Sequence, residues 1–495
     1  MGIDLGTWGA SIAVFDTSTR RARPIPNRAG SARTPSAVAF TEDGRRLVGR
    51  AARERAVLAP AAVAEDIPAR LAARWPFEHA GVRHDPVDLA AAVIGSLLDD
   101  AERELGERPR AAVLASPSHA GLAGRCAVAE AAERAGLEVS RLIGDTAATA
   151  LAHASSPPRD IDGTVVVLDL GGGSLGLSLA EIGDGVCEIL ATGGDGALGG
   201  LAWDRRLAEH LCDAFEDTHG VRLREDPVAR RRVAEAAERA KIALSTAQET
   251  EIRVPSLARA AGGGLVDLEA TVSRSELAAL TRDLARRCAA ALDGVFAGVV
   301  PERASAYGPS SVREVLLAGE AARLPALHEL LVERYRGRRP RLRTADPHSV
   351  AAGAAIQAAG LTGHQRDALL MEVTPAMLAV ATDDAGHLTP VIPRGTTIPR
   401  RRTVTVDLPG GRTPAAVGVY EGNAPSPARN DLLAVLELPA RPGPSRAEVT
   451  IDVASNRTVH ASARDLATGR ITALTVSDRT IGDAIRRRWS GVPRG

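Results

Sequence analysis

The sequence contains a short acidic and glycine-rich segment whose residue types suit the binding of a phosphate group. It reads Asp-Leu-Gly-Gly-Gly-Ser over residues 169–174 and follows the apolar run 164–168. Glycine leaves backbone N–H groups uncovered and tolerates positive φ, so a polyanion can approach the chain closely. The apolar run predicts a strand buried on both faces, and the alternation that resumes at Leu175 predicts a second strand after the turn. The candidate phosphate-binding residues are Asp169, Gly171, Gly172, Gly173 and Ser174.

A second copy of this pattern lies near the N-terminus. Asp4, Gly6 and Thr7 are followed by Trp8 and by the apolar segment 11–15. One glycine-rich hairpin is weak evidence, because such turns also occur in ordinary hairpins. Repetition of Asp-Leu-Gly and a hydroxyl residue at long range indicates two related lobes. We therefore expect a shared ligand in the cleft between these lobes.

Composition narrows the class of protein. The 495 residues suffice for two to four domains, and the formal net charge of zero provides no overall field for nucleic acid or a membrane. The four cysteines form no Cys-x-x-Cys pair and are typical of buried thiols in a reducing compartment. No apolar run approaches eighteen residues, and Asp4 lies inside the first predicted strand, so we expect neither a membrane span nor a signal peptide and a cytoplasmic location.

The single lysine of the chain, Lys241, lies in a predicted helix over residues 236–245. Glu238 and Ser245 are three residues before it and four residues after it, so the three side chains share one helix face. A solvated Glu-Lys pair is the simpler interpretation of this spacing. The absence of any other lysine makes a ligand-binding face the alternative.

Several segments in the same order resemble the seventy-kilodalton heat-shock chaperones of the DnaK type, from residue 1 to about residue 480. Residues 2–7 and 169–174 look like the two phosphate loops of that family, and residues 190–200 look like a further phosphate-side turn. Residues 236–245 resemble the helix that holds the adenosine, and residues 316–325 resemble the second adenosine segment. The resemblance implies an α/β two-lobed actin-like ATPase domain of the ribonuclease H-like class, followed by a β-sandwich substrate-binding domain.

The resemblance also implies a set of site residues and cofactors. The expected ligands are ATP or ADP with Mg²⁺, and the metal would be held largely through water by Asp4 and Asp169. Asp145, Asp169 and Thr7 would take part in catalysis. The expected nucleotide contacts are Asp4, Gly6, Thr7, Trp8, Asp169, Gly171, Gly172, Gly173, Ser174, Gly199, Gly200, Glu238, Lys241, Ser245, Gly319 and Arg323.

The expected domains are a nucleotide-binding domain over 1–363, a linker over 364–373, a β-sandwich over 374–480 and a tail over 481–495. The apolar linker segment 369–371 lies between polar residues and predicts a docking strap. Short alternating strands are predicted at 403–407, 416–420, 434–437 and 448–453. In the family a helical lid follows the sandwich, and we expect it to be absent because the chain ends at Gly495.

Departures from the family pattern concentrate on the catalytic side. Ala69 matches a lysine that reaches the phosphates, and Arg70 next to it would point elsewhere if the segment is helical. Asp145 matches a glutamate, Gly176 matches an aspartate, and Glu320 matches a glycine. Trp8 and Gly9 replace small hydroxyl and polar residues, and residues 75–88 are shorter than in the family. Loss of one preorganised electrostatic group typically reduces turnover by about a hundred- to a thousand-fold, so we expect slow or absent ATP hydrolysis.

Two functions follow from the resemblance. The first is an ATP-binding chaperone that couples nucleotide state to the binding of unfolded polypeptide, with roles in protein folding and the stress response. The second is a pseudo-ATPase that senses nucleotide and binds one specific partner. Pro117 and Arg125 match residues that relay nucleotide state in the family, and a nucleotide-exchange factor or a J-domain protein is the implied co-chaperone. Asp383 matches an apolar position of the peptide groove, so we expect weak and rapidly exchanging peptide binding.

Overall fold

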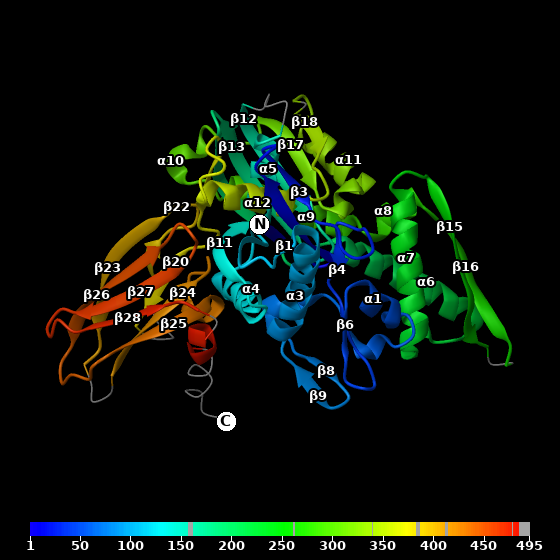
Figure 1. Ribbon diagram of the computed structural model, residues 1–495, viewed down its shortest axis with the longest axis horizontal. Helices are drawn as coiled ribbons and strands as arrows, with labels where there is room; N and C mark the ends of the chain where they lie inside the picture. Colours follow the sequence, from blue (N-terminus) through cyan, green and yellow to red (C-terminus); the bar gives the residue numbers. More distant parts are fainter. Residues whose placement is uncertain are drawn as a thin grey trace.

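The computed structural model describes residues 1–156, 162–260, 263–338, 340–382, 387–410, 414–477 and 479–484. Figure 1 shows two α/β lobes, each built on its own sheet, and a β-sandwich beside the first lobe. None of the described helices is long and apolar enough to cross a membrane. The arrangement brings both predicted phosphate hairpins into the α/β part of the molecule.

The first lobe is organised around a sheet with the order β11-β10-β1-β2-β3, and β4 pairs with β2. Strands β1 and β2 form the first predicted hairpin, in which Asp4 lies opposite Ser11. Helices α3 and α4 cover this sheet through a core of Val, Leu, Ile and Ala side chains. The bounds are β1 Gly2–Leu5, β2 Gly9–Asp16, β3 Arg21–Pro24, β4 Thr34–Pro35, β10 Ala111–Ser116, β11 Glu138–Gly144, α3 Pro86–Leu105 and α4 Leu122–Arg134.

The second lobe contains a seven-stranded sheet with the order β18-β17-β12-β13-β14-β19-β22. Strands β12 and β13 form the second predicted hairpin, in which Asp169 lies opposite Gly176. The two hairpins therefore place an aspartate at equivalent positions, as the duplication predicts. The bounds are β12 Gly163–Leu170, β13 Leu175–Gly183, β14 Val186–Asp195, β17 Val312–Ala318, β18 Arg341–Thr344, β19 Leu369–Val373 and β22 Thr397–Ile398.

Two helices, α5 (Asp145–Ala154) and α12 (Ser349–Leu361), pack closely against each other in the middle of the α/β part. A Cβ atom at Gly353 of α12 would lie only 1.9 Å from the carbonyl oxygen of Ala148 in α5. The close approach of the two helix backbones therefore requires glycine at this position. This crossing fixes the start of α5, where Asp145 lies.

Smaller elements flank the cleft between the lobes. On the side of the first lobe these are α1 (Arg50–Ala56), α2 (Ile67–Ala73) and the hairpin β8 (Phe77–His79) and β9 (Val82–His84). On the other side lie α6 (Gly200–His219), α7 (Pro227–Leu244) and the long hairpin β15 (Glu249–Arg259) and β16 (Leu265–Ser273). The side chain of Asp226 accepts hydrogen bonds from the N–H groups of Val228 and Ala229 and so caps α7, which carries Glu238 and Lys241.

The C-terminal part forms a β-sandwich of two antiparallel four-stranded sheets, with the orders β21-β20-β24-β25 and β23-β26-β27-β28. The four predicted strands are confirmed as parts of β23, β24, β25 and β26. Val380, Val419 and Ile451 from the two sheets are fully buried between them. The bounds are β20 Leu378–Ala381, β21 Thr389–Ile392, β23 Arg400–Leu408, β24 Ala415–Glu421, β25 Asp431–Leu438, β26 Ser445–Val453, β27 Val459–Asp465 and β28 Ile471–Thr475.

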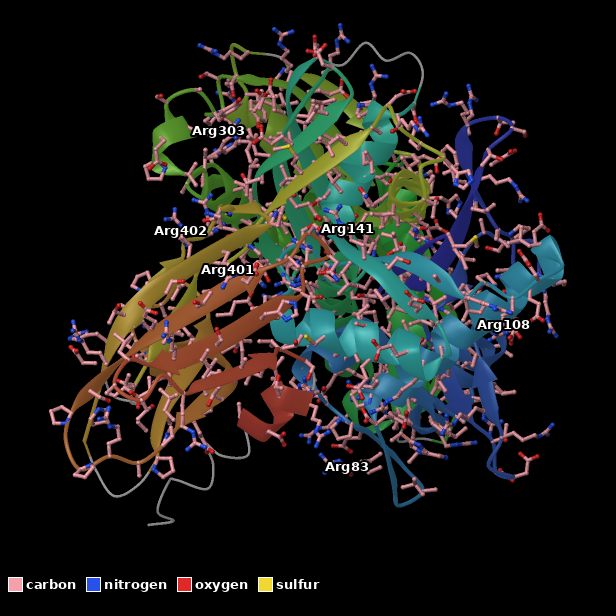
Figure 2. All side chains as sticks on the ribbon, turned by 60° about the vertical axis from the view of Figure 1, so that its left-hand side comes forward. Arg83, Arg108, Arg141, Arg303, Arg401 and Arg402 are labelled. Atoms are coloured by element: carbon pink, nitrogen blue, oxygen red, sulfur yellow. The ribbon has the colours of Figure 1, made fainter. Side chains whose placement is uncertain are left out.

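The segment that connects the α/β lobes to the sandwich is itself a strand. β19 pairs in parallel with β14 and antiparallel with β22, so the predicted docking strap adds to the sheet of the second lobe. Glu372 of β19 is buried and accepts a hydrogen bond from the N–H of Gly144 at 2.9 Å. It also pairs with Arg141 of β11 at 3.3 Å, and Figure 2 shows Arg141 close to where the sandwich meets the first lobe.

Candidate functional site in the cleft between the lobes

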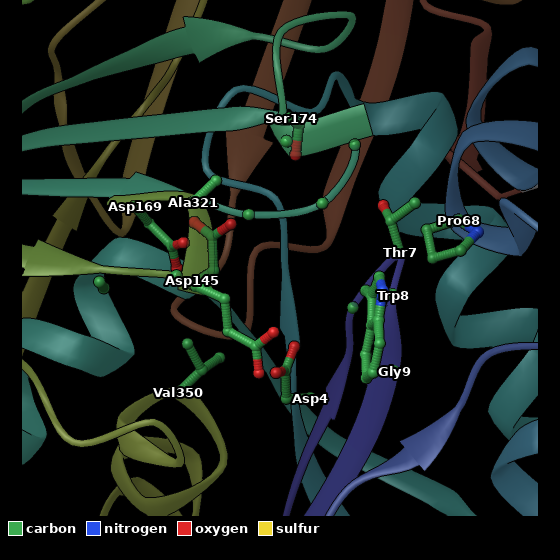
Figure 3. Close-up of a pocket in the computed structure, with 18 of the residues that line it drawn as sticks. Asp4, Thr7, Trp8, Gly9, Pro68, Asp145, Asp169, Ser174, Ala321 and Val350 are labelled. Carbon is green, nitrogen blue, oxygen red and sulfur yellow. The ribbon is translucent and has the colours of Figure 1, made fainter. Parts of the chain in front are cut away.

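The two Asp-Leu-Gly hairpins end at one cavity of about 150 Å³ between the lobes (Figure 3). The structure brings fourteen of the predicted site residues to its lining, and it leaves Gly199, Ser245 and Arg323 outside it. Both hairpins, α5 and α7 therefore converge on a single site. The predicted residues that line it are Asp4, Gly6, Thr7, Trp8, Asp145, Asp169, Gly171, Gly172, Gly173, Ser174, Gly200, Glu238, Lys241 and Gly319.

The glycines of the second loop allow the two hairpins to touch. A Cβ atom at Gly173 would lie 2.6 Å from the hydroxyl oxygen of Thr7, and one at Gly172 would lie 3.1 Å from the Cβ of Trp8. A Cβ at Gly199 would lie 2.4 Å from the carbonyl oxygen of Gly172, so Gly199 supports the loop from behind instead of lining the cavity. The glycines thus serve close backbone packing as well as access for a ligand.

Three carboxylates, Asp4, Asp145 and Asp169, come together at the inner end of the cavity. The pKa of Asp4 is raised to about 6, mainly by desolvation, while the guanidinium of Arg33 opposes this shift and the nearby charge of Asp145 adds to it. Desolvation together with the charges of Asp145 and Asp4 raises the pKa of Asp169 well above its usual value. The cluster therefore repels itself when it is fully ionised, and a bound cation would relieve that repulsion.

Asp145 is held firmly at the start of α5. Its Oδ1 atom accepts hydrogen bonds from the N–H of Ser118 at 2.9 Å, from the hydroxyl of Ser118 at 2.5 Å and from the N–H of Thr146 at 2.6 Å. These bonds fix the position of the carboxylate but occupy one of its two oxygens. Its Oδ2 atom accepts no hydrogen bond from any residue that the structure describes.

The donor set fits Mg²⁺ when most of its ligands are water and phosphate oxygens. Asp4 and Asp169 offer hard carboxylate oxygens, which this small cation prefers, and it usually takes only one or two of them. Within the described residues, no group of three His, Cys, Asp or Glu side chains could enclose a metal ion directly. The residues present are therefore compatible with a water-mediated site.

The predicted adenosine helix α7 makes contacts that spacing alone did not indicate. Glu238 accepts a hydrogen bond from Nε1 of Trp8 at 2.8 Å and another from Arg53 at 3.3 Å. The guanidinium of Arg53 also lies 4.2 Å from the centre of the Trp8 ring. Trp8, at the first predicted phosphate loop, therefore joins the first lobe to α7.

Lys241 is buried and donates to Asp204 of α6 at 2.7 Å and to the carbonyl oxygen of Gly200 at 3.1 Å. The structure therefore does not show the alternative of a solvated pair with Glu238, because α6 covers this face of α7 and supplies a different carboxylate. Desolvation raises the pKa of Asp204 to about 6 in spite of the opposing effect of Lys241. Lys241 lines the cavity while its ammonium group serves a structural ion pair.

Two predicted adenosine contacts lie away from the cavity. Ser245 follows the last residue of α7, and its hydroxyl donates to the carbonyl oxygen of Ile242 at 2.6 Å. Arg323 lies in the 3₁₀ turn Glu320–Arg323 and is exposed. The described arrangement therefore keeps the phosphate side of the predicted site more completely than the adenosine side.

The structure also locates the departures on the catalytic side. Ala69 is exposed on α2, whereas the Nε of Arg70 donates to the carbonyl oxygen of Glu65 at 3.0 Å and its guanidinium lies over Phe77. The expectation that Arg70 points away from the phosphates is confirmed. A Cβ atom at Gly176 would lie 3.2 Å from Oδ1 of Asp145, so an aspartate there would crowd that carboxylate.

Sequence reasoning missed several lining residues, among them Arg33, Asp204 and Asp346. Arg33 lies outside every recognised motif and reaches the site only because β4 pairs with the first hairpin. A single lysine on a helix with an apolar face could have suggested a buried acidic partner, but nothing in the sequence identified Asp204. These residues come from segments whose proximity is a property of the folded chain.

A duplicated hairpin on each side of one cleft, crossing helices beneath it and an attached β-sandwich define a two-lobed α/β protein with a further β domain. The family model described as "Hsp70 protein" matches residues 1–76 and 69–484. The chaperone protein DnaK of Thermotoga neapolitana is 36% identical over 488 residues, which cover 97% of this chain and 80% of the relative. The DnaK proteins of Thermotoga maritima and Thermosipho melanesiensis are each 35% identical over the same shares.

The chain therefore belongs to the Hsp70 family and is an ATP-binding chaperone of that family. Members of this family combine a two-lobed actin-like ATPase domain with a β-sandwich domain, and the observed sheets are consistent with that architecture. They bind ATP or ADP with Mg²⁺, and they bind polypeptide clients and co-chaperones.

Proposed function

We propose that the cavity between the lobes binds ADP or ATP with Mg²⁺, with the phosphates between the two hairpins. The observation that carries this proposal is the convergence of both Asp-Leu-Gly hairpins on one cavity that contains three mutually repelling carboxylates. Asp4 and Asp169 would hold the metal through water, and Thr7, Ser174 and the backbone of residues 171–173 would contact the phosphates.

Within this site each side chain has a limited role. Asp145 orients a water molecule through its free oxygen, because its other oxygen is hydrogen-bonded to Ser118 and Thr146. Thr7 lies against Gly173 and so holds the two loops at a fixed separation. The metal ion, when bound, neutralises charge on the phosphate oxygens. Glu238 is positioned for a ribose hydroxyl, in competition with the indole N–H of Trp8.

We infer that hydrolysis is slow compared with an intact family member. Ala69 offers no cation to the phosphates, Arg70 points away, and Gly176 supplies no carboxylate. Each loss removes a group that would stabilise charge or orient water in the transition state. A pseudo-ATPase that senses nucleotide without cycling is the second candidate function, and the same three observations favour it.

A route for coupling nucleotide state to the sandwich runs through α4. Pro117 lines the cavity, and the helix that begins at Leu122 contacts the sandwich. Glu421 of β24 accepts hydrogen bonds from the N–H of Leu122 and from Arg125. We propose that the sandwich over 374–480 binds an extended polypeptide and that the linker over 364–373 transmits the change from the nucleotide-binding domain over 1–363. Asp383, on which the prediction of weak peptide binding depends, lies outside the described residues, as does most of the tail over 481–495.

Two measurements test this function. Calorimetry with ADP and Mg²⁺ should show binding, whereas absence of heat at millimolar nucleotide would contradict the proposal. A single-turnover ATP assay then separates the two candidates, because a chaperone that cycles must convert bound ATP to ADP, and a pseudo-ATPase must leave it intact. Turnover at the rate of an intact family member would contradict the inferred loss of catalytic groups.

A further inference from the structure

Arg33 reaches the cavity from the segment just before β4 and spans the space between the lobes. Its Nη1 donates to Glu320 of the second lobe at 3.0 Å, and its Nη2 donates to the carbonyl oxygen of Pro347 at 3.1 Å. The aliphatic part of the side chain lies against Gly9, where a Cβ atom would come within 2.6 Å of the Cγ of Arg33. The side chain is 19% exposed, so packing and two hydrogen bonds hold the guanidinium in place.

The guanidinium still has donors to offer. Arginine has five N–H donors, and the two hydrogen bonds named above use two of them. The Nε atom of Arg33 is buried and has no hydrogen-bond acceptor among the described residues. A buried donor without an acceptor is costly, so an acceptor supplied by a ligand would be favourable at this point.

Arg33 lines the same cavity as Asp4 and Asp169. The charge of its guanidinium opposes the rise in pKa that desolvation causes at both carboxylates. No hydrogen bond joins Arg33 to either carboxylate among the interactions of the described residues. The cation is therefore near the proposed metal ligands without being neutralised by them.

Other cations near the site are engaged elsewhere. Among the described residues, Arg33 and Lys241 are the two cationic side chains that line the cavity. Lys241 is paired with buried Asp204, and Arg53, which is not among the lining residues, is paired with Glu238. The position that resembles the phosphate-binding lysine of the family is Ala69, which carries no charge.

We propose that Arg33 is the phosphate-binding cation of this protein and takes the place of the lysine that is missing at Ala69. This inference rests on the proposed nucleotide site and assigns to it a residue outside the family motifs. The planar guanidinium can present parallel N–H donors to two phosphate oxygens, a geometry that an ammonium group does not provide. The ion pair with Glu320 is exposed on the glutamate side and is weak enough to yield to a phosphate.

The test compares ligands with and without phosphate. Calorimetry with Mg²⁺ is carried out on the wild-type protein, on Arg33→Met and on Arg33→Lys, with ADP, pyrophosphate and adenosine as ligands. Methionine keeps an unbranched stem against Gly9 and removes the charge, so ADP and pyrophosphate affinity should fall about 10- to 100-fold. Adenosine affinity should change less than about twofold, because the contact is made to phosphate. The affinity of Arg33→Lys for ADP and pyrophosphate should lie between that of the wild type and that of Arg33→Met. Arg28→Ala, at an exposed position in the same loop, is the matched control and should bind like the wild type.

A second variant leaves Arg33 in place. Glu320→Gln removes the carboxylate that shares the guanidinium, and ADP affinity should rise about two- to fivefold. Equal ADP binding by wild type and Arg33→Met, or unchanged ADP binding in Glu320→Gln, would overturn the assignment while leaving the nucleotide site intact. Failure of the wild-type protein to bind either ADP or pyrophosphate would instead overturn the nucleotide site itself, and the assignment with it.

Discussion

The contact between α4 and the β-sandwich should control whether the two parts of the protein are docked. Glu421 and Arg125 form an ion pair at 3.2 Å, and their side chains are only 4% and 7% exposed. Arg141 and Arg457 lie nearby and share Glu372, so three arginines face two glutamates in this cluster. Burial lowers the pKa of Arg457, whose charge the glutamates help to retain. The perturbation of choice is Glu421→Gln, which keeps the shape of the side chain and removes its charge.

The expected magnitude follows from the burial of the pair. Removal of one partner from a buried ion pair costs about 3–5 kcal/mol, because the other charge is left desolvated. Undocking of the sandwich returns Arg125 to water and avoids that cost. Glu421→Gln should therefore shift the equilibrium toward the undocked sandwich by a factor of about a hundred to several thousand. The stability of the sandwich and that of the α/β lobes, each taken by itself, should stay nearly unchanged.

Hydrogen exchange of the linker measures this equilibrium. The amides of β19 that pair with β14 and the N–H of Leu122 should exchange much faster in Glu421→Gln than in the wild type. Asp407→Asn, at an exposed position of β23, is the control and should leave exchange unchanged. The double variant Arg125→Met with Glu421→Gln should recover much of the protection, since neither member of the Arg125–Glu421 pair is then left charged without its partner. Wild-type protection of the linker in Glu421→Gln would refute the reasoning.

Three further predictions concern the cleft. Lys241→Ala should lower the free energy of unfolding, measured by urea titration, by about 3–5 kcal/mol, because Asp204 would be left buried without its partner. A variant with wild-type stability that no longer binds ADP would contradict this prediction. Asp4 has a pKa raised from 3.8 to about 6 in the ligand-free protein, so the native state loses stability as the pH rises through that range. Asp4→Asn should therefore be more stable than the wild type at pH 8, by up to about 3 kcal/mol, with a smaller difference at pH 5, and a less stable variant at pH 8 would contradict the sign. Ala69→Lys should raise the rate of single-turnover ATP hydrolysis. Adding Gly176→Asp should raise this rate little further, because the new carboxylate would crowd that of Asp145. A large additional gain in rate from Gly176→Asp would show that this crowding is unimportant.

The sequence was sufficient to predict elements whose patterns are local. Apolar periodicity and glycine at turns predict both Asp-Leu-Gly hairpins, the helix with Glu238 and Lys241 on one face and the four strands of the sandwich. Ala69 was expected on a helix with Arg70 turned away, and α2 confirms this because neighbouring residues of a helix point in different directions. The resemblance to the DnaK-type chaperones supplied the order of these elements and the position of the cleft.

The partners of the side chains were decided by the tertiary structure. Helical spacing placed Glu238 and Lys241 together, yet Glu238 meets Trp8, 230 residues away in the chain, and Lys241 meets Asp204 of another helix. Arg33 meets Glu320 across 287 residues. Hydrogen bonds and ion pairs act over a few ångströms, so a local pattern cannot select among sixty arginines and sixty-one carboxylates. Which of these groups come within that distance is fixed by the tertiary structure, namely by the packing of the two lobes, the crossing of α5 and α12 and the docking of the sandwich.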